Sequence, residues 1–222
     1  MTAKNKIVIF GTGDIAQIAN YYFHIDSDYE VVAFTVDKEY MSGNEYEGKP
    51  LLNFDELKET YPPSSVKVFI ALSYASLNKL REKKFYEILD LGYELVSYVS
   101  SKCTYLSQFP PGRNCFIFED NTVQPFVTIM DNVTLWSGNH IGHHSIIHSH
   151  NFVSSHVVIS GHCTIESNCF LGVNSTIGHQ VKIARECIIG AGSIITKNTE
   201  EKSVYVPAKS IVLDKKSDLI KL

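Results

Sequence analysis

One apolar position recurs every six residues through the second half of the chain. Residues 115–198 divide into fourteen consecutive hexads without an insertion, and the third residue of each hexad is Ile, Leu or Val. The first residue is Cys, Asn, Val or Ser, and the last three are rich in Gly, Asn, Ser and His, which favour turns. A fixed short period of this kind predicts a parallel β-helix, in which short strands stack coil upon coil.

The first 96 residues show a different pattern, in which apolar runs alternate with amphipathic segments. Apolar runs at residues 6–10, 31–36, 66–72 and 94–99 predict strands. One helix is expected to end at about residue 24, and another to cover residues 76–91 with its apolar side chains on one face. This alternation predicts an α/β domain of Rossmann-like type, with a parallel sheet covered on both sides. Asn78 and Arg81 are expected on the solvated side of the second helix.

The turn after the first strand has the spacing of a dinucleotide-binding loop. Gly11, Gly13 and Ala16 fit the pattern G-x-G-x-x-[GA] between a strand and a helix. In this motif the amides at the start of the helix hold phosphate, and an acidic residue about 20 positions on holds a ribose. The predicted nucleotide-binding residues are Gly11, Thr12, Gly13, Asp14 and Asp37, with Ser73 and Tyr74 after the third strand. A vestigial domain that only packs against the β-helix is the alternative.

The unbroken hexads behind this small domain resemble the left-handed β-helix acyltransferases. The likeness is greatest to the bacterial sugar O- and N-acetyltransferases, the group of the sialic acid O-acetyltransferases and the UDP-4-amino-sugar N-acetyltransferases. The resemblance implies that three hexads complete one triangular coil, so that residues 18 apart lie one above the other. It also implies three parts: a Rossmann-like nucleotide-sugar-binding domain over residues 1–96, a left-handed β-helix acyltransferase domain over 97–204, and an exit segment over 205–222.

An activity is implied by the same resemblance. It is the transfer of an acetyl group from acetyl-CoA to an amine or hydroxyl of a nucleotide-linked sugar, for a surface polysaccharide such as lipopolysaccharide O-antigen. The expected assembly is a homotrimer, in which the donor clefts form where adjacent prisms meet. A non-catalytic sugar-nucleotide-binding or scaffold protein on the same fold is the alternative, and a metal-dependent hydratase is a third reading.

Eight of the nine histidines fall between residues 140 and 179, and the resemblance assigns two of them to catalysis. His143 matches the family's [IV]-x-His pattern for the general base, and His144 stands where an acid commonly orients that base. An imidazole titrates near neutral pH and is suited to accept a proton from an attacking group. The expected donor-site residues are Gly161, whose backbone amide would bind the thioester, His162, His179, and Pro207, Ala208 and Lys209 of the exit segment.

Net charge, the length of the apolar runs and the cysteine spacing limit the partners and the cellular location that are expected. The net charge is −4 with no basic cluster, so neither a nucleic acid nor a membrane surface is expected as a partner. No apolar run approaches the roughly 20 residues of a membrane span, and a cytoplasmic protein is expected. All five cysteines are spaced by multiples of six, which predicts buried thiols at the first place of a hexad.

A metal site is not expected within one subunit. His144, His150 and His156 end successive hexads, so they should lie at three different corners of the triangle. A site built across subunits remains open at this point.

Overall fold

The computed structural model describes residues 5–212, 214, 216–217 and 220. Its first part is a five-stranded sheet in the order β3-β4-β2-β1-β5, in which β3 is antiparallel to β4 and the other neighbours are parallel. The strands are β1 (Asn5–Phe10), β2 (Tyr29–Val36), β3 (Glu45–Tyr46), β4 (Lys49–Asn53) and β5 (Lys67–Ile70). The helices are α1 (Asp14–Ile25), α2 (Leu57–Thr60) and α3 (Lys79–Asp90), with 3-10 turns η1 (Lys38–Tyr40) and η2 (Phe54–Glu56).

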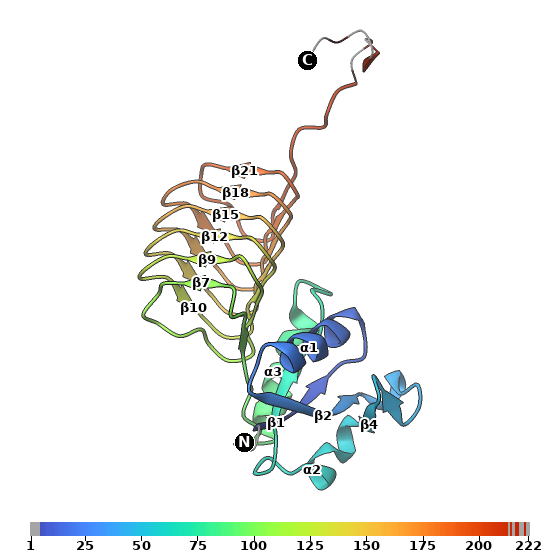
Figure 1. Ribbon diagram of the computed structural model, residues 1–222. Helices are drawn as coiled ribbons and strands as arrows, with labels where there is room; N and C mark the ends of the chain where they lie inside the picture. The colour runs from blue at the N-terminus through green and yellow to red at the C-terminus, as the bar shows by residue number, and fades with distance from the viewer. Residues whose placement is uncertain (1–4, 213, 215, 218–219, 221–222) are drawn as a thin grey trace.

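The second part is a three-sided column of two-residue strands that pair in parallel with the strands 18 residues away (Figure 1). The first side, which we call the docking face, contains β6 (Tyr98–Val99), β8 (Phe116–Ile117), β11 (Thr134–Leu135), β14 (Phe152–Val153), β17 (Phe170–Leu171), β20 (Ile188–Ile189) and β22 (Val204–Tyr205). The second side contains β7 (Thr104–Tyr105), β9 (Thr122–Val123), β12 (His140–Ile141), β15 (Val158–Ile159), β18 (Thr176–Ile177) and β21 (Ile194–Ile195). The third side contains β10 (Thr128–Ile129), β13 (Ile146–Ile147), β16 (Thr164–Ile165) and β19 (Lys182–Ile183).

The predicted hexad frame is the frame of the column. The third residue of every hexad is at most 7% exposed, and these side chains fill the interior. The first residue is also buried in each hexad, and polar residues at this place, except Ser175, bond across coils. The Asn139 side-chain oxygen, for example, accepts the Val157 amide at 2.8 Å, and the Ser145 hydroxyl oxygen accepts the Cys163 amide at 3.0 Å. Inward polar side chains therefore satisfy backbone groups that would otherwise be buried without partners.

The corner residues explain why Asn, Gly, Asp and His recur in the sequence. Every sixth residue from Asn114 to Gly192 has a positive φ, between 53° and 76°. This left-handed conformation suits glycine, and among other residues Asn, Asp and His adopt it most readily. Four of the clustered histidines occupy such corners: His144, His150, His156 and His162.

The N-terminal domain lies against the lower coils of the column (Figure 1), and its core continues into the docking face. Phe23 of α1 and Phe69 of β5 contact Tyr98 and Phe116, which point outward from the column. The predicted strand over residues 94–99 is therefore wrong as a single element. Leu95 makes one bridge to Val68 of the N-terminal sheet, and β6 is already the first rung of the docking face. At the other end, β22 pairs with β20 across the boundary placed at residue 204.

The expectation that Asn78 and Arg81 are solvated is wrong, because the start of α3 is pressed against the docking face. Asn78 is fully buried and Arg81 is 2% exposed. The Arg81 guanidinium donates to the Thr134 hydroxyl and to the carbonyls of Asn132 and Asn151. Burial lowers the pKa of Arg81 to about 10. The helix itself begins at Lys79 rather than at residue 76, because residues 76–78 all have positive φ.

All five cysteines are free, and four of them are buried in the column as the spacing predicts. Among the described residues, no helix is both long enough and apolar enough to cross a membrane.

The hexad frame predicts that a charged residue destabilises the fold far more at one position of β15 than at the neighbouring position. Ile159 is fully buried, whereas Val158 is 39% exposed. Replacing Ile159 with Asp should lower the free energy of unfolding by about 3–5 kcal/mol, because the carboxylate would be buried without a partner. Val158→Asp is the matched control and should lower it far less. Denaturant unfolding followed by circular dichroism measures both, and equal losses would contradict the frame.

Candidate active site

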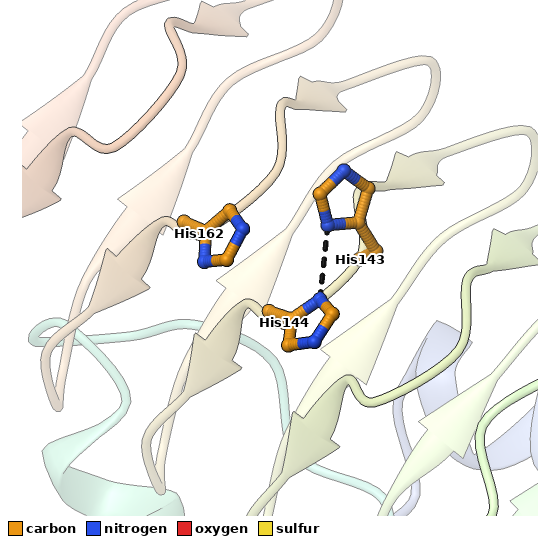
Figure 2. A group of neighbouring side chains, drawn as sticks. All are labelled: His143, His144 and His162. Atoms are coloured by element: carbon orange, nitrogen blue, oxygen red, sulfur yellow. Dashed lines mark hydrogen bonds between the residues drawn. The ribbon is translucent and has the colours of Figure 1, made fainter.

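Five predicted site residues meet at one edge of the column, between its second and third sides. We call this edge the histidine corner. It consists of His143, His144, Gly161, His162 and His179. The turns after β12, β15 and β18 bring these residues together in three successive coils. The side chains of His143, His144 and His162 are exposed and face one another (Figure 2).

His143 is held from two directions. Its backbone amide donates to the Gln124 side-chain oxygen at 2.9 Å, and its carbonyl accepts the His162 amide at 2.9 Å. The Nδ1 atoms of His143 and His144 lie 3.0 Å apart, the dashed contact in Figure 2. This contact requires a hydrogen on one nitrogen and a lone pair on the other. His144 thus provides the hydrogen-bond partner that the sequence left unresolved.

The ring of His144 is fixed in a stack. It lies 4.6 Å from the Phe126 ring below and 4.8 Å from the His162 ring above, with only 12° between the two imidazole planes. Such aromatic stacking limits the rotation of His144 and so directs its Nδ1 at His143. The sequence predicted the two-coil register of His144 and His162, but not the contribution of Phe126.

Gly161 is the residue that makes room for His143. A Cβ atom at this position would lie 2.8 Å from Cε1 and 2.9 Å from Nε2 of the His143 ring, which is closer than van der Waals contact allows. The Gly161 amide donates to no group in the described part of the chain. The Gly161 backbone, whose N–H has no acceptor in the described part of the chain, therefore lies next to the imidazole that is the candidate base.

The pKa of His162 is lowered by partial desolvation and by the neighbouring imidazoles of His144, His143 and His179. The His179 ring lies 5.5 Å from that of His162 and perpendicular to it. Each protonated imidazole would repel the others, so the group favours the neutral form of His162.

The predicted nucleotide loop borders a separate hollow of ≈ 240 Å³ in the N-terminal domain. Gly11, Thr12 and Gly13 line it together with Asp37 and Lys84. Gly11 has φ +125°, and a Cβ there would lie 2.8 Å from the Ala71 carbonyl oxygen, so the turn requires glycine. Gly13 has open space where a Cβ would be, at the start of α1. Asp14 is in the first turn of α1, where its own carboxylate complements the helix dipole.

Lys84 fixes the predicted ribose-binding acid and was missed in the sequence. Its Nζ lies 2.6 Å from an oxygen of Asp37 and 2.6 Å from one of Glu87, and its side chain is 7% exposed. The rings of Phe10 and Phe54 enclose the same ammonium group. Burial acts to lower the pKa of Lys84, but the two carboxylates outweigh it and the pKa is raised. The helical spacing Lys84-x-x-Glu87 is the only sequence signal for this arrangement.

Ser73 and Tyr74 do not line this hollow, contrary to the prediction. The Tyr74 ring instead lies 4.9 Å from Phe152 and 4.8 Å from Phe170 on the docking face. The left-handed residues 76–78 follow after Ala75, in a segment between β5 and α3 that lies against the docking face. Tyr74 helps to line a groove of ≈ 370 Å³ that also includes Ile15 and Trp136.

The histidine corner and the nucleotide loop lie on different sides of the column. The N-terminal domain contacts the docking face and both of its edges, through Tyr22 to Glu119 at one edge and Glu82 to Asn168 at the other. The histidine corner is the remaining edge. Pro207, Ala208 and Lys209 are exposed and follow β22, in the segment that leaves the end of the column (Figure 1).

One segment of the column matches a known family model. Residues 162–197 match the model described as bacterial transferase hexapeptide, six repeats. The parallel three-sided coils and the six-residue repeat fit the fold of a left-handed β-helix. No curated protein sequence matches it.

Solved structures share this architecture over nearly the whole chain. The acetyltransferase domain of PglB from Neisseria gonorrhoeae has a TM-score of 0.80 at 18% identity, covering 94% of this chain and 100% of that one. PerB from Caulobacter crescentus, in complex with CoA and GDP-perosamine, has a TM-score of 0.78 at 19% identity, covering 92% and 96%. WeeI from Acinetobacter baumannii has a TM-score of 0.68 at 17% identity, covering 90% and 96%. At these identities the likeness establishes the fold.

A substitution of Lys84 tests whether its buried ammonium group stabilises the wall of the hollow beside the nucleotide loop. Lys84→Met keeps the aliphatic volume but removes two charge-assisted hydrogen bonds, and should lower the free energy of unfolding by about 1.5–3 kcal/mol. Lys83→Met is the matched control in the same helix. Lys83 is 69% exposed and lies 3.5 Å from Glu87, so its loss should change stability by under about 0.5 kcal/mol. Urea unfolding measures the free energy of unfolding of the two variants. Equal losses in both would contradict a stabilising role for the buried ammonium group of Lys84.

Proposed function

We propose that this protein is an acetyl-CoA-dependent acetyltransferase that acts on an amine or hydroxyl of a nucleotide-linked sugar, for the synthesis of a surface polysaccharide. One observation carries the proposal: the hydrogen-bonded pair of His143 and His144 lies beside Gly161, whose amide has no acceptor in the described part of the chain. Acyl transfer from a thioester needs a proton acceptor and a fixed N–H donor for the oxyanion, and these are the two groups at the histidine corner.

The geometry supports a specific division of roles. In the proposed tautomer His143 donates from Nδ1 to the Nδ1 lone pair of His144, which leaves Nε2 of His143 free to take the proton of the attacking group. The acceptor then attacks the thioester carbonyl and its proton passes to Nε2 of His143, while the Gly161 amide stabilises the oxyanion. The C–S bond breaks, and the leaving CoA thiolate takes the proton from the His143 imidazolium, which restores the base. His144 stabilises the imidazolium of His143 by accepting its hydrogen bond, in the place where an acid commonly stands. His144 is thus a positioning residue, held by its stack between Phe126 and His162.

The proposed substrates are assigned from the positions of the histidine corner and the nucleotide loop, and from the ligands with which similar proteins were solved. The acetyltransferase domain of PglB has been solved with acetyl coenzyme A, and PerB with CoA and GDP-perosamine. We assign the donor to the histidine corner, with His162 and His179, and propose Pro207, Ala208 and Lys209 of the exposed segment as further donor contacts. We assign the nucleotide to the loop Gly11–Gly13, with Asp37 on the ribose, where Lys84 holds its carboxylate in place.

The main test replaces the proposed base. His143→Asn should lower kcat for acetyl transfer by roughly 10²–10⁴, the usual contribution of general acid–base catalysis. Coenzyme A affinity should change little, because backbone amides hold the donor. Mass spectrometry after incubation with acetyl-CoA and a panel of UDP-, GDP- and dTDP-linked amino and hydroxy sugars measures the product.

His156→Asn is the control for this variant. His156 is an exposed histidine at another corner of the column, and its replacement should leave the rate unchanged. A hydroxyl acceptor must lose its proton during attack, so an O-transferase should depend on His143 more than an N-transferase does. An unchanged rate in His143→Asn with a hydroxyl acceptor would refute the assigned base. A wild-type protein that binds a nucleotide sugar but transfers no acetyl group would favour a non-catalytic binding protein.

We also propose a homotrimer as the active form. Within one chain the histidine corner lies at the edge of the column that the described part of its N-terminal domain does not contact, so the nucleotide loop and the base are in separate places. A neighbouring subunit that places its histidine corner beside the groove lined by Tyr74, Ile15 and Trp136 would bring a base and a nucleotide loop into one site. Light scattering should give about three times 24.9 kDa, and a fully active monomer would disprove the shared site.

A further inference from the structure

Three imidazoles at the histidine corner are close enough to share one ligand. Each of His143, His144 and His162 offers a ring nitrogen, and these nitrogens all lie within 4.8 Å of one another (Figure 2). Two of the residues are adjacent in one coil, and the third comes from the coil above. His144, His150 and His156 do lie at three different corners, as expected, and cannot share an ion. His162 follows His144 by 18 residues and therefore lies one coil above it at the same corner.

The spacing suits a small metal ion. Zinc–imidazole bonds are about 2.0–2.1 Å long in tetrahedral sites, which places neighbouring ligand nitrogens somewhat over 3 Å apart. The Nδ1 atoms of His143 and His144 are already at 3.0 Å. His162 is exposed and its ring is free of side-chain hydrogen bonds in the described part of the chain, so a rotation of this ring closes the remaining gap. All three side chains are exposed, so water can supply a further ligand.

We propose that His143, His144 and His162 form a binding site for a borderline divalent transition-metal ion such as Zn²⁺. Neutral imidazoles select Zn²⁺, Cu²⁺, Ni²⁺ and Co²⁺, whereas Mg²⁺ and Ca²⁺ require oxygen ligands, and no carboxylate belongs to the group. The stack of His144 between Phe126 and His162 holds two of the three ligands near one another before the ion arrives.

The ion would act as an inhibitor of the proposed reaction, and this consequence rests on the proposed function. A neutral imidazole has one unprotonated nitrogen. Whichever nitrogen of His143 the ion takes, the lone pair needed to accept a proton is lost. Metal binding and base catalysis therefore exclude each other at His143. Removal of the ion by a chelator restores the enzyme.

The binding test is independent of activity. The full chain, stripped with EDTA, is titrated with Zn²⁺ against a chromophoric chelator, and with Co²⁺ to record the absorption bands of a tetrahedral ion. One ion per chain at micromolar or tighter affinity is expected. His144→Asn and His162→Asn should each weaken binding by at least about tenfold, since even outer-shell partners of a metal contribute 10–100-fold.

His156→Asn is the matched control, because Asn suits the left-handed backbone at all three of these corners. It should bind Zn²⁺ as wild type does, and circular dichroism confirms that the variants are folded. Millimolar binding by the wild type, or equal affinity in all three variants, would overturn the site.

Activity then separates the two proposals. Inhibition of wild-type acetyl transfer over the same Zn²⁺ range, reversed by EDTA, supports the inhibitory role, and an unchanged rate in the zinc-loaded protein overturns that role. Absence of transfer in the metal-free protein overturns the proposed function and leaves the binding result standing.

Discussion

The left-handed turn at every sixth residue is the constraint on which the rest of the structure depends. With φ between 53° and 76° at fourteen successive corners, each strand is limited to two residues before the chain changes side. The third residue of each hexad then points inward, and residues 18 apart are brought into register. The interior of the column is filled by one apolar side chain per hexad, and the first residue of the hexad completes its hydrogen bonding.

Both candidate sites depend on this regularity in different ways. The histidine corner uses the vertical register directly, because His143, Gly161 and His179 come from three coils at one edge. The N-terminal domain uses the flat docking face as part of its own core, with Phe116 and Tyr98 beneath α1. Arg81 joins the two by donating to groups on the column. The domain cannot shift along the column without breaking these buried bonds, and so the position of the nucleotide loop relative to the prism is fixed.

The sequence predicted the column well because the six-residue period is unbroken. The burial of Ile159 follows from counting hexads, whereas the proximity of Gly161 to His143 and the stacking of His162 on His144 follow from the three-hexad coil that the resemblance implies. The sequence was a poorer guide wherever one domain meets the other. The sequence places Asn78 and Arg81 on the polar side of an expected helix, and no local pattern reveals that backbone carbonyls replace water there. Tyr74 was expected near the nucleotide loop because it follows a strand, but the chain after it turns toward the docking face through residues 76–78, and no sequence pattern marks this turn. Lys84 was overlooked because a lysine on a helix is usually solvated, whereas here two phenylalanine rings enclose it.

The corner conformation also has a consequence for how such a protein changes over generations. Asn, Asp and His tolerate the same backbone angles, and their codons differ only in the first base. A single nucleotide change can therefore exchange an inert amide for an imidazole or a carboxylate at a corner while the coil keeps its shape. The column behaves as a scaffold on which reactive groups are gained, lost or moved by one coil without passing through an unfolded ancestor. His150, for example, stands one mutational step from the asparagines that occupy the same corner one coil below and one coil above it, Asn132 and Asn168.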